Sequence, residues 1–190
     1  MKKLFITVII LSFGVYVNGA IIYVKPGGTG VGSSWAAAFG SLQSALQIAV
    51  SGDQIWVAQG TYLPSNIGNI DTSFYLENGV AVYGGFAGTE TTLAVRADTT
   101  GVLTILSGDL GSGLHSNHVV YGVSTLDSTA ILNGFTVSGG VYAVSGSDIY
   151  DGGAGMYNTG SPSLANIIFK NNTLSETLKI TLTSMGRLYS

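Results

Sequence analysis

The sequence has 190 residues, which suits one domain or one part of a repeat array and excludes a chain with several independent cores. It has a net charge of −3, and its 28 glycines, 46% hydrophobic residues and only 9% charged residues exclude a chain that charge keeps unfolded, so we expect a buried core. The absence of cysteine excludes disulfides and thiolate metal sites, and a single basic residue against nine acidic ones between Pro26 and Phe169 predicts no nucleic-acid partner.

Residues 1–20 have the pattern of a secretory signal peptide. Two lysines precede an apolar run over residues 4–17, which ends in small residues. The run is shorter than the about 20 residues that a membrane-spanning helix needs, and no second run of its length follows. We therefore expect export, cleavage near Ala20 or after Gly19, and a secreted or cell-surface (outer membrane-associated) location. We expect no membrane-spanning segment in the mature chain.

Residues 21–53 are predicted to form a strand and a helix. The β-branched and aromatic residues that begin this segment indicate a strand, and the proline and glycines at 26–28 end it. A helix is predicted from Ser34 to about residue 50, with Ser33 or Ser34 as its N-cap and Gly52 beyond its end. The residues spaced for one helical face are Trp35, Phe39, Leu42, Leu46 and Ala49.

Residues 54–172 contain short apolar runs separated by turns. Successive main runs lie roughly 23 to 32 residues apart, within the range of stacked repeat architectures. Because these intervals contain no helical pattern, a parallel β-helix explains them better than a leucine-rich or helical solenoid does. The main runs are Ile55–Val57, Val80–Val82, Leu103–Leu106, Ile131–Val137 and Leu164–Phe169, and a further run, Val119–Tyr121, lies inside the third interval.

The turns between these runs fit the same architecture. Stacked coils lie about 4.8 Å apart, so their turns need residues that tolerate left-handed backbone angles. The pairs with this property are Gly84-Gly85, Gly139-Gly140, Gly152-Gly153 and Asn171-Asn172. The predicted fold class is therefore all-β, a parallel β-helix with one N-terminal capping α-helix that covers the strand edges and the apolar interior of the first coil. The alternative is an antiparallel sandwich, with Asn78-Gly79 and Asn133-Gly134 as hairpin loops.

Several motifs within residues 21–172 form a combination that is similar to one found in a known group of proteins. They are Tyr23-Val24, Gly27 to Ala36, Leu42 to Leu46, Gly52 to Tyr62, Val82 to Phe86, Ile105 to Asp109 and Leu132 to Gly140. Together they resemble the N-terminal end of secreted right-handed β-helix proteins of the pectin-lyase-like superfamily. The resemblance implies a right-handed parallel β-helix (solenoid), and it is specific for fold rather than for chemistry.

A second pair of motifs is similar to polymorphic-outer-membrane-protein repeats of Bacteroidota-like surface proteins. These repeats combine a Gly-Gly-Ala-aliphatic element with Phe-x-x-Asn. Gly152-Gly153-Ala154 and the segment from Phe169 to Asn172 match them, although Gly155 replaces the aliphatic residue and Met156 takes its place. This resemblance implies a repeated surface module of a large exported protein.

Residues 173–190 depart from the repeat. Glycine is absent until Gly186, and the apolar residues do not form the expected next coil. Because the resembling proteins are longer and an uncapped array exposes its apolar end, we interpret the chain as a truncated or frame-shifted N-terminal fragment whose tail covers that end. The expected organisation is a signal peptide at 1–20, a strand and capping helix at 21–53, β-helix coils at 54–172 and an atypical tail at 173–190.

Candidate catalytic residues are sparse. Polysaccharide lyases of this fold need a base and a group that neutralises a uronate carboxylate, and Arg96 is the basic residue available. The acids that would have to join it are at least two of Asp98, Asp109, Asp127 and Asp148. The simpler interpretation of Arg96-Ala97-Asp98 is a loop ion pair. Glycoside hydrolysis needs two carboxylates about 5 to 9.5 Å apart, and Asp148 and Asp151 form the one close acidic pair in the sequence.

No metal or cofactor site is predicted. The loop from Asp148 to Asp151 lacks the ligand density of a dedicated calcium loop, so its acids are interpreted as solvated. His115 and His118 are three positions apart without an adjacent third ligand, which favours structural or surface roles. Asn171-Asn172-Thr173 fits a glycosylation acceptor, to which we assign no role. We assign no catalytic, cofactor-binding or metal residue.

The function we expect is that of a non-enzymatic, secreted or cell-surface β-helix module in adhesion or carbohydrate contact. This function is favoured because the sequence has few charged residues that could serve in catalysis, whereas its motifs for the fold are clear. Exposed tyrosines or tryptophans would stack on sugar rings. Its partner would be a carbohydrate or a host or cell-surface ligand. The alternative is a polysaccharide lyase or glycoside hydrolase of the same superfamily.

Overall fold

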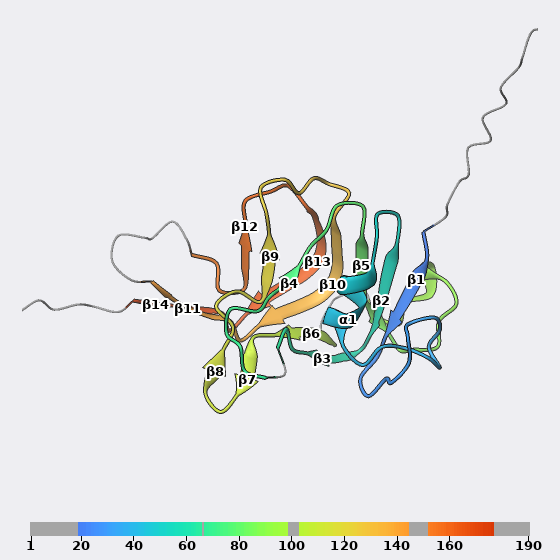
Figure 1. Ribbon diagram of the computed structural model, residues 1–190, viewed down its shortest axis with the longest axis horizontal. Coiled ribbons are helices and arrows are strands. Elements are labelled where there is room, and N and C mark those ends of the chain that lie inside the picture. Colours follow the sequence, from blue (N-terminus) through green and yellow to red (C-terminus); the bar gives the residue numbers. More distant parts are fainter. Residues whose placement is uncertain (1–18, 66, 99–102, 145–151, 177–190) are drawn as a thin grey trace, which may run out of the picture.

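The computed structural model describes residues 19–65, 67–98, 103–144 and 152–176, and these are mostly β-strand with one α-helix (Figure 1). The first strands and helices are β1 (Ile21–Val24), α1 (Leu42–Ile48), β2 (Gln54–Ala58), β3 (Gly60–Tyr62), β4 (Phe74–Tyr75), β5 (Ala81–Phe86) and the 3₁₀-helix η1 (Leu93–Val95). The remaining strands are β6 (Thr104–Ser107), β7 (Asp109–Gly111), β8 (Leu114–His115), β9 (Val120–Gly122), β10 (Ile131–Ser138), β11 (Val141–Val144), β12 (Met156–Asn158), β13 (Ser163–Lys170) and β14 (Thr173–Glu176).

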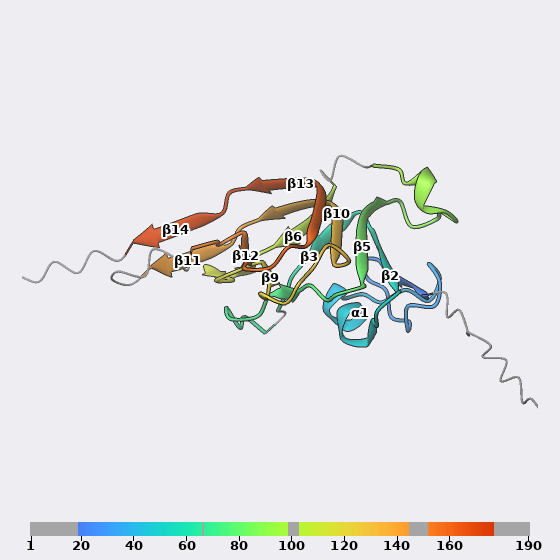
Figure 2. The ribbon, with the colours of Figure 1, turned by 90° about the horizontal axis from the view of Figure 1, so that it is seen from above.

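The strands stack in parallel into a curled sheet. β1, β2, β5, β10 and β13 lie side by side in this order, and β3, β6 and the second half of β10 continue the sheet around a bend. A separate sheet joins β4, β9 and β12, and β11 pairs with β14. Figure 2 shows β13 lying outside β10 at one side of the molecule, with α1 at the other. This arrangement is solenoid-like.

Among the strands of the described residues, only β7 and β8 pair antiparallel, in a small hairpin, and one isolated antiparallel bridge joins Thr29 to Phe39. The sandwich alternative is therefore wrong. Asn133-Gly134 lies inside β10 rather than at a hairpin, and Asn78-Gly79 leads into β5. There the backbone N–H of Gly79 donates to Thr129 Oγ1 of the next coil at 2.8 Å.

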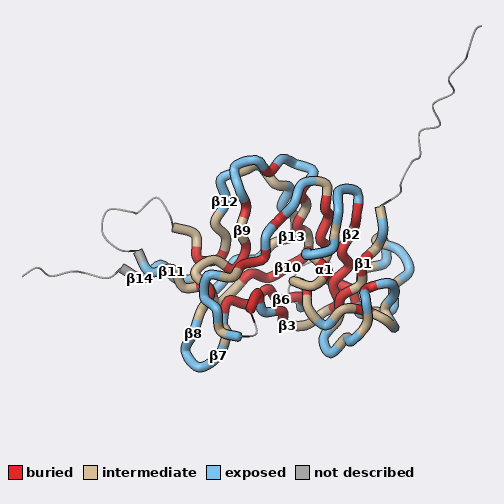
Figure 3. The backbone as a smooth tube through the Cα atoms, in the orientation of Figure 1, coloured by how far each residue is buried: buried red, intermediate tan, exposed pale blue. Residues whose placement is uncertain are grey.

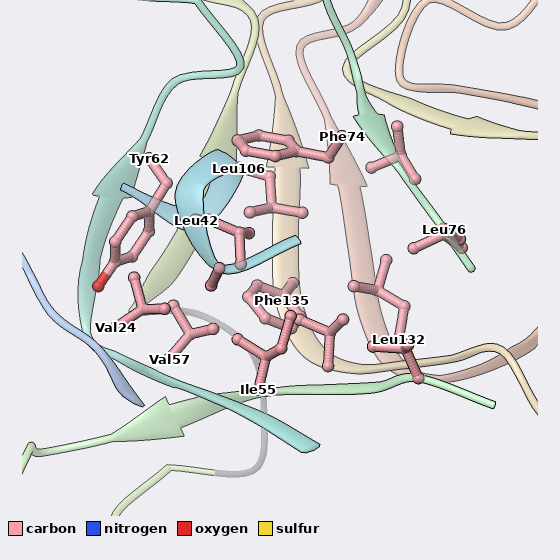
Figure 4. Close-up of a cluster of buried hydrophobic side chains, with 14 of the residues drawn as sticks. Val24, Leu42, Ile55, Val57, Tyr62, Phe74, Leu76, Leu106, Leu132 and Phe135 are labelled. Atoms are coloured by element: carbon pink, nitrogen blue, oxygen red, sulfur yellow. The ribbon is translucent and has the colours of Figure 1, made fainter. Parts of the chain in front are cut away.

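The core consists of inward side chains that lie above one another in register. One column runs Ile22, Ile55, Val82, Leu132 and Leu164 through four successive parallel pairs. Its first four members are buried, whereas Leu164 in the outermost strand is 42% exposed. Figure 3 shows the buried positions along β2 and β10, and Figure 4 shows Ile55, Leu132 and Phe135 pointing into the same interior. Apolar residues of one strand are thus covered by those of its neighbours.

Left-handed residues lie at the bend between the two parts of the sheet, and two of them are in register. Gly134 in β10 has φ of +85°, and Asn166, which lies opposite it in β13, has φ of +53°. Gly85 in β5 has φ of +86°. Glycine and asparagine tolerate this region of the backbone better than other residues do, which explains their positions in three successive coils.

The recurrence predicted for residues 54–172, with one coil for each main apolar run, is wrong in one interval. The run Leu103–Leu106 does not begin a coil of its own, because β6 pairs with β3 and with the second half of β10. The strand that follows β5 in the first column is β10, with Ala81 paired to Ile131. The third coil is therefore longer than its neighbours, and it carries the η1 segment and the β7–β8 hairpin as insertions.

The capping helix is shorter than predicted. It begins at Leu42 instead of Ser34, and its N-cap residue Ser41 makes no side-chain capping bond. The segment before it pairs with β1 instead: Phe39 N–H donates to Tyr23 O at 2.9 Å, and Phe39 O accepts from Lys25 N–H at 2.9 Å. Covering the free edge of β1 satisfies backbone groups that a longer helix would leave unpaired. The cap is therefore shared between this loop and α1, which buries Leu42 and Ala45 in the core.

The predicted signal peptide and most of the predicted atypical tail lie outside the described residues. Of residues 173–190, the described part forms β14, which continues the parallel pairing beside β11. In the described part of the chain, no helix combines the length and apolar character needed to cross a membrane.

Leu132→Ala is expected to lower the free energy of unfolding by about 2 to 5 kcal/mol, because it leaves a cavity in the buried column. Leu164→Ala in the same column is the matched control, and its cost is expected to be less than half as large since its side chain is 42% exposed. Urea unfolding of both variants measures the difference. Equal losses would contradict the order of the column.

Gly85→Ala is expected to destabilise the fold more than Gly111→Ala does. Both glycines have positive φ, so both substitutions cost about 1 to 2 kcal/mol of backbone strain. A Cβ at Gly85 would also lie 1.6 Å from the carbonyl oxygen of Asp98, whereas a Cβ at Gly111 meets open space. Thermal unfolding compares the two variants, and a Gly111→Ala variant that unfolds first would contradict this account of the bend.

Candidate functional site

Three tyrosines form a ladder on the outer face of the β4–β9–β12 sheet. Tyr75, Tyr121 and Tyr157 are direct partners in the parallel register. The ring centroids of Tyr75 and Tyr121 are 5.1 Å apart, and those of Tyr121 and Tyr157 are 5.0 Å apart with nearly parallel planes. Because side chains alternate along a strand, the residues directly before these tyrosines, which are Phe74, Val120 and Met156, point inward. We call the three tyrosines the tyrosine ladder.

His118 attaches to the side of the tyrosine ladder. Its ring stacks on Tyr142 at 4.7 Å and lies 5.3 Å from Tyr157 and 5.9 Å from Tyr121. Nδ1 lies 3.1 Å from Gly153 O, and because a carbonyl oxygen only accepts, Nδ1 carries the proton in this contact. The imidazole is thereby fixed in orientation against the ladder.

The two ends of the tyrosine ladder each open into a hollow. Tyr75 lines a hollow of about 430 Å³ together with Gln47 and Glu77. At the opposite end, Tyr157 lines a hollow of about 480 Å³ together with Asn158. The middle ring, Tyr121, has a tyrosine on either side, so the aromatic surface available to a ligand lies at the terminal rings.

A third hollow adjoins the one at Tyr75. It has a volume of about 470 Å³ and shares Gln43, Gln47 and Pro64 with its neighbour. The two together follow α1, and we call them the α1 groove. Gln43 Nε2 donates to Pro64 O at 3.0 Å and to Ser73 O at 2.9 Å, so the helix is tied to the opposite wall.

A different aromatic cluster covers the outer side of β1, β2 and β5. Trp56 stacks on Phe86 at 4.7 Å, Trp35 lies 5.5 Å from Phe86, and Tyr23 contacts both tryptophans edge-on. Trp56 and Phe86 are buried. This cluster packs loops onto the sheet, so its buried rings are structural.

Arg96, the main catalytic candidate, belongs to that loop packing. Its guanidinium lies 5.4 Å from the ring centre of Tyr83, and Nη1 donates to Gly84 O at 3.1 Å and to Asn133 Oδ1 at 3.3 Å. Burial lowers the pKa of Arg96 from its ordinary value, and its electrostatic interaction with Tyr83 partly offsets this. The structure therefore positions Arg96 between an aromatic ring and an amide of the next coil.

The described acidic candidates make hydrogen bonds with the backbone. The carboxylate of Asp109 accepts from Gly111 N–H at 3.0 Å, and that of Asp127 accepts from Thr129 N–H at 2.8 Å. The backbone N–H of Asp98 donates to Gly85 O at 2.9 Å. Asp148 and Asp151 lie outside the described residues. The carboxylates of Asp109, at the start of β7, and of Asp127 thus each bond to the backbone two residues further along the chain.

The two histidines are tied to different turns. His115 Nδ1 lies 2.8 Å from Gly139 O, whereas His118 is held by Gly153 O. Within the described ranges, no group of three or more His, Cys, Asp or Glu side chains could hold a metal ion.

Asn172 connects two coils. Its Oδ1 accepts from Gly140 N–H at 3.0 Å and its Nδ2 donates to Val137 O at 2.9 Å, which gives the asparagine of the Phe-x-x-Asn element a structural role. Asn171, the residue before it, is exposed at the corner with φ of +54°.

The tyrosine ladder was missed by the sequence analysis, although a signal for it exists. Each ladder tyrosine directly follows an apolar residue in a very short strand, as in Phe74-Tyr75, Val120-Tyr121 and Met156-Tyr157. These pairs become recognisable only once the register between the coils is known.

Comparisons with known proteins leave the chain without an assigned relative. No protein-family model, no curated protein and no solved structure matches it.

Glu90 holds the loop that covers the second aromatic cluster. Its carboxylate accepts from the backbone N–H groups of Ala87 at 2.6 Å, Gly88 at 2.9 Å and Thr89 at 3.0 Å, and its carbonyl accepts from Trp35 Nε1 at 2.8 Å. Partial burial acts to raise the pKa of Glu90, but these backbone hydrogen bonds outweigh it and lower the pKa below the ordinary value.

The lowered pKa of Glu90 predicts a loss of stability in acid. Its contribution is fully present above the unfolded pKa and is lost as pH falls through the lower folded pKa. Glu90→Gln is therefore expected to be less stable than the wild type at neutral pH, with the difference shrinking on acidification. Urea unfolding over a pH series measures this. A difference that stays constant down to the most acidic sample would contradict the role of the carboxylate.

Proposed function

We propose that this chain is a non-enzymatic β-helix module, secreted or at a cell surface, that contacts carbohydrate through the tyrosine ladder. The single observation that carries the proposal is the in-register ladder of Tyr75, Tyr121 and Tyr157 with a hollow at each end. Tyrosine has an apolar ring and a polar tip, so it suits sugars, which have apolar ring faces edged by hydroxyls.

Tyr75 is the ring best placed for such a contact. It is 46% exposed and has a neighbouring ring, Tyr121, within stacking distance on one side. It also lines the hollow beside α1. A sugar in that hollow would extend the ladder by one more stacked ring, and the parallel register fixes the orientation of the platform before the ligand arrives.

Binding rather than catalysis is favoured by what the candidate catalytic groups contact. Arg96 donates to Gly84 O and Asn133 Oδ1, while Asp109 and Asp127 each accept a hydrogen bond from the backbone N–H two residues further along the chain. A lyase or hydrolase would need these groups to face a common substrate. The alternative enzyme function gains no support from these contacts.

The finer fold and the location are part of the same proposal. Parallel connections within a sheet are right-handed in about 98% of cases, which supports a right-handed β-helix for this curled parallel sheet. The motifs that resemble the pectin-lyase-like superfamily support it independently. The lysines and apolar run of residues 1–20 support export and a secreted or surface location.

Tyr75→Ala is expected to reduce carbohydrate affinity at least about tenfold, equivalent to about 1.4 kcal/mol, because it removes the terminal ring of the ladder. The purified chain is screened on an array of neutral and acidic oligosaccharides, and the affinity of each variant for the strongest binder is then measured by calorimetry. Tyr75→Phe keeps the ring and is expected to retain most of the affinity.

Val95→Ala is the matched control, because Val95 is an exposed apolar residue in η1, away from the ladder. It should bind like the wild type, and all three variants should keep the circular dichroism spectrum of the folded wild type. Absence of binding to every oligosaccharide on the array would overturn the proposal, as would full affinity in Tyr75→Ala.

A further inference from the structure

The α1 groove offers more room than one stacked sugar needs. Its two hollows measure about 430 and 470 Å³ and meet at Gln43, Gln47 and Pro64. Each is within the about 300 to 1,000 Å³ of ordinary small-molecule sites. Tyr75 lies at one end of the groove and Thr61 at the other. A ligand that fills it is therefore extended, with several linked rings.

The walls of the α1 groove are held in place by hydrogen bonds. Gln43 bridges from the helix to Pro64 O and Ser73 O. Ser73 Oγ donates in turn to His118 O at 2.6 Å, which ties the same wall to the coil that carries Tyr121. The buried residues Leu42 and Ala45 anchor the opposite side of α1 in the core. The groove is thus largely formed before a ligand binds, which lowers the entropic cost of binding.

One face of α1 supplies the groove with neutral polar groups. Ser41, Ser44 and Gln47 follow one another at steps of three, so they lie on one side of the helix, and all three line the groove. Thr61 and Thr72 face them from the other segments. Hydroxyl and amide groups both donate and accept hydrogen bonds, as sugar hydroxyls do.

The charge of the α1 groove limits the kind of sugar that fits. Among its described lining residues, Glu77 is the one with a side chain charged at neutral pH, and no lysine or arginine lines either hollow. A uronate carboxylate would meet Glu77 without a compensating cation, which is unfavourable for like charges in a partly enclosed site. A neutral sugar meets no such penalty.

From these observations we infer that the α1 groove binds a short neutral oligosaccharide, with Tyr75 stacked on its terminal ring, and discriminates against uronate-containing glycans. The inference rests on the proposed carbohydrate function and adds the substrate class and the path of the bound chain. Ser44 and Gln47 contact the rings beyond the one on Tyr75, and Glu77 acts as the selecting charge.

The groove is tested by filling it. Ser44→Trp places a large side chain from half-buried Ser44 into the hollow that does not contain Tyr75, and it leaves Tyr75 untouched. We expect it to lower affinity for neutral oligosaccharides such as cellohexaose, or the strongest neutral binder on the array, at least about tenfold. The monosaccharide is expected to bind weakly and equally to the wild type and to Ser44→Trp. Val95→Ala serves again as the control, and circular dichroism verifies the fold of each variant.

The charge selection is tested separately with Glu77→Gln. We expect this variant to bind an oligogalacturonate severalfold more tightly than the wild type at low salt, so that the ratio of its affinities for the acidic and the neutral oligosaccharide also rises severalfold. Preferential binding of the oligogalacturonate by the wild type would overturn the inference, as would no change in Glu77→Gln.

The outcomes separate this inference from the proposed function. If binding disappears in Tyr75→Ala but persists in Ser44→Trp, the ladder binds sugar and the groove does not, so only the inference fails. If no oligosaccharide on the array binds to the wild type, both fail. If Ser44→Trp and Tyr75→Ala both lose the neutral oligosaccharide, both stand.

Discussion

Every feature of this fold depends on parallel strands that stack in register. A single strand here is too short to bury its own apolar side, so residues such as Ile55, Val82 and Leu132 depend on their counterparts in neighbouring coils for burial. The same register acts on the outer face. It places a tyrosine above a tyrosine in β4, β9 and β12, so the core and the candidate binding surface have one structural cause.

The N-terminal end of the stack shows how an open coil is closed. The loop that contains Phe39 satisfies the edge of β1, and α1 covers the apolar interior with Leu42 and Ala45. Because α1 meets β4 as well as β1 and β2, the helix stands beside the first tyrosine of the ladder. The α1 groove thus results from the capping of the stack, because it forms where the capping helix lies beside β1, β2 and β4.

The sequence predicted those features that depend on nearby residues. Runs such as Ile55–Val57 are recognisable as strands because their apolar and β-branched residues are contiguous, and the parallel pairing follows from the recurrence of such runs without helices. Two-residue strands such as β4 have no period to detect. The start of α1 was predicted too early because Phe39 makes backbone hydrogen bonds to the edge of β1. The helical spacing from Trp35 to Ala49 does not show that this edge needs a partner. The tyrosine ladder depends on register across residues 75 to 157, which no local pattern encodes.

The most direct test of the stacking is the direction of β13 relative to β10. The chain has no cysteine, so introduced pairs have no competing thiol. Parallel pairing places Ile131 beside Ser163 and Ser138 beside Lys170, at a spacing that a disulfide can bridge. We expect rapid oxidation of Ile131→Cys with Ser163→Cys and of Ser138→Cys with Lys170→Cys. Cross-linking instead of Ile131→Cys with Lys170→Cys would show opposite directions and contradict the account.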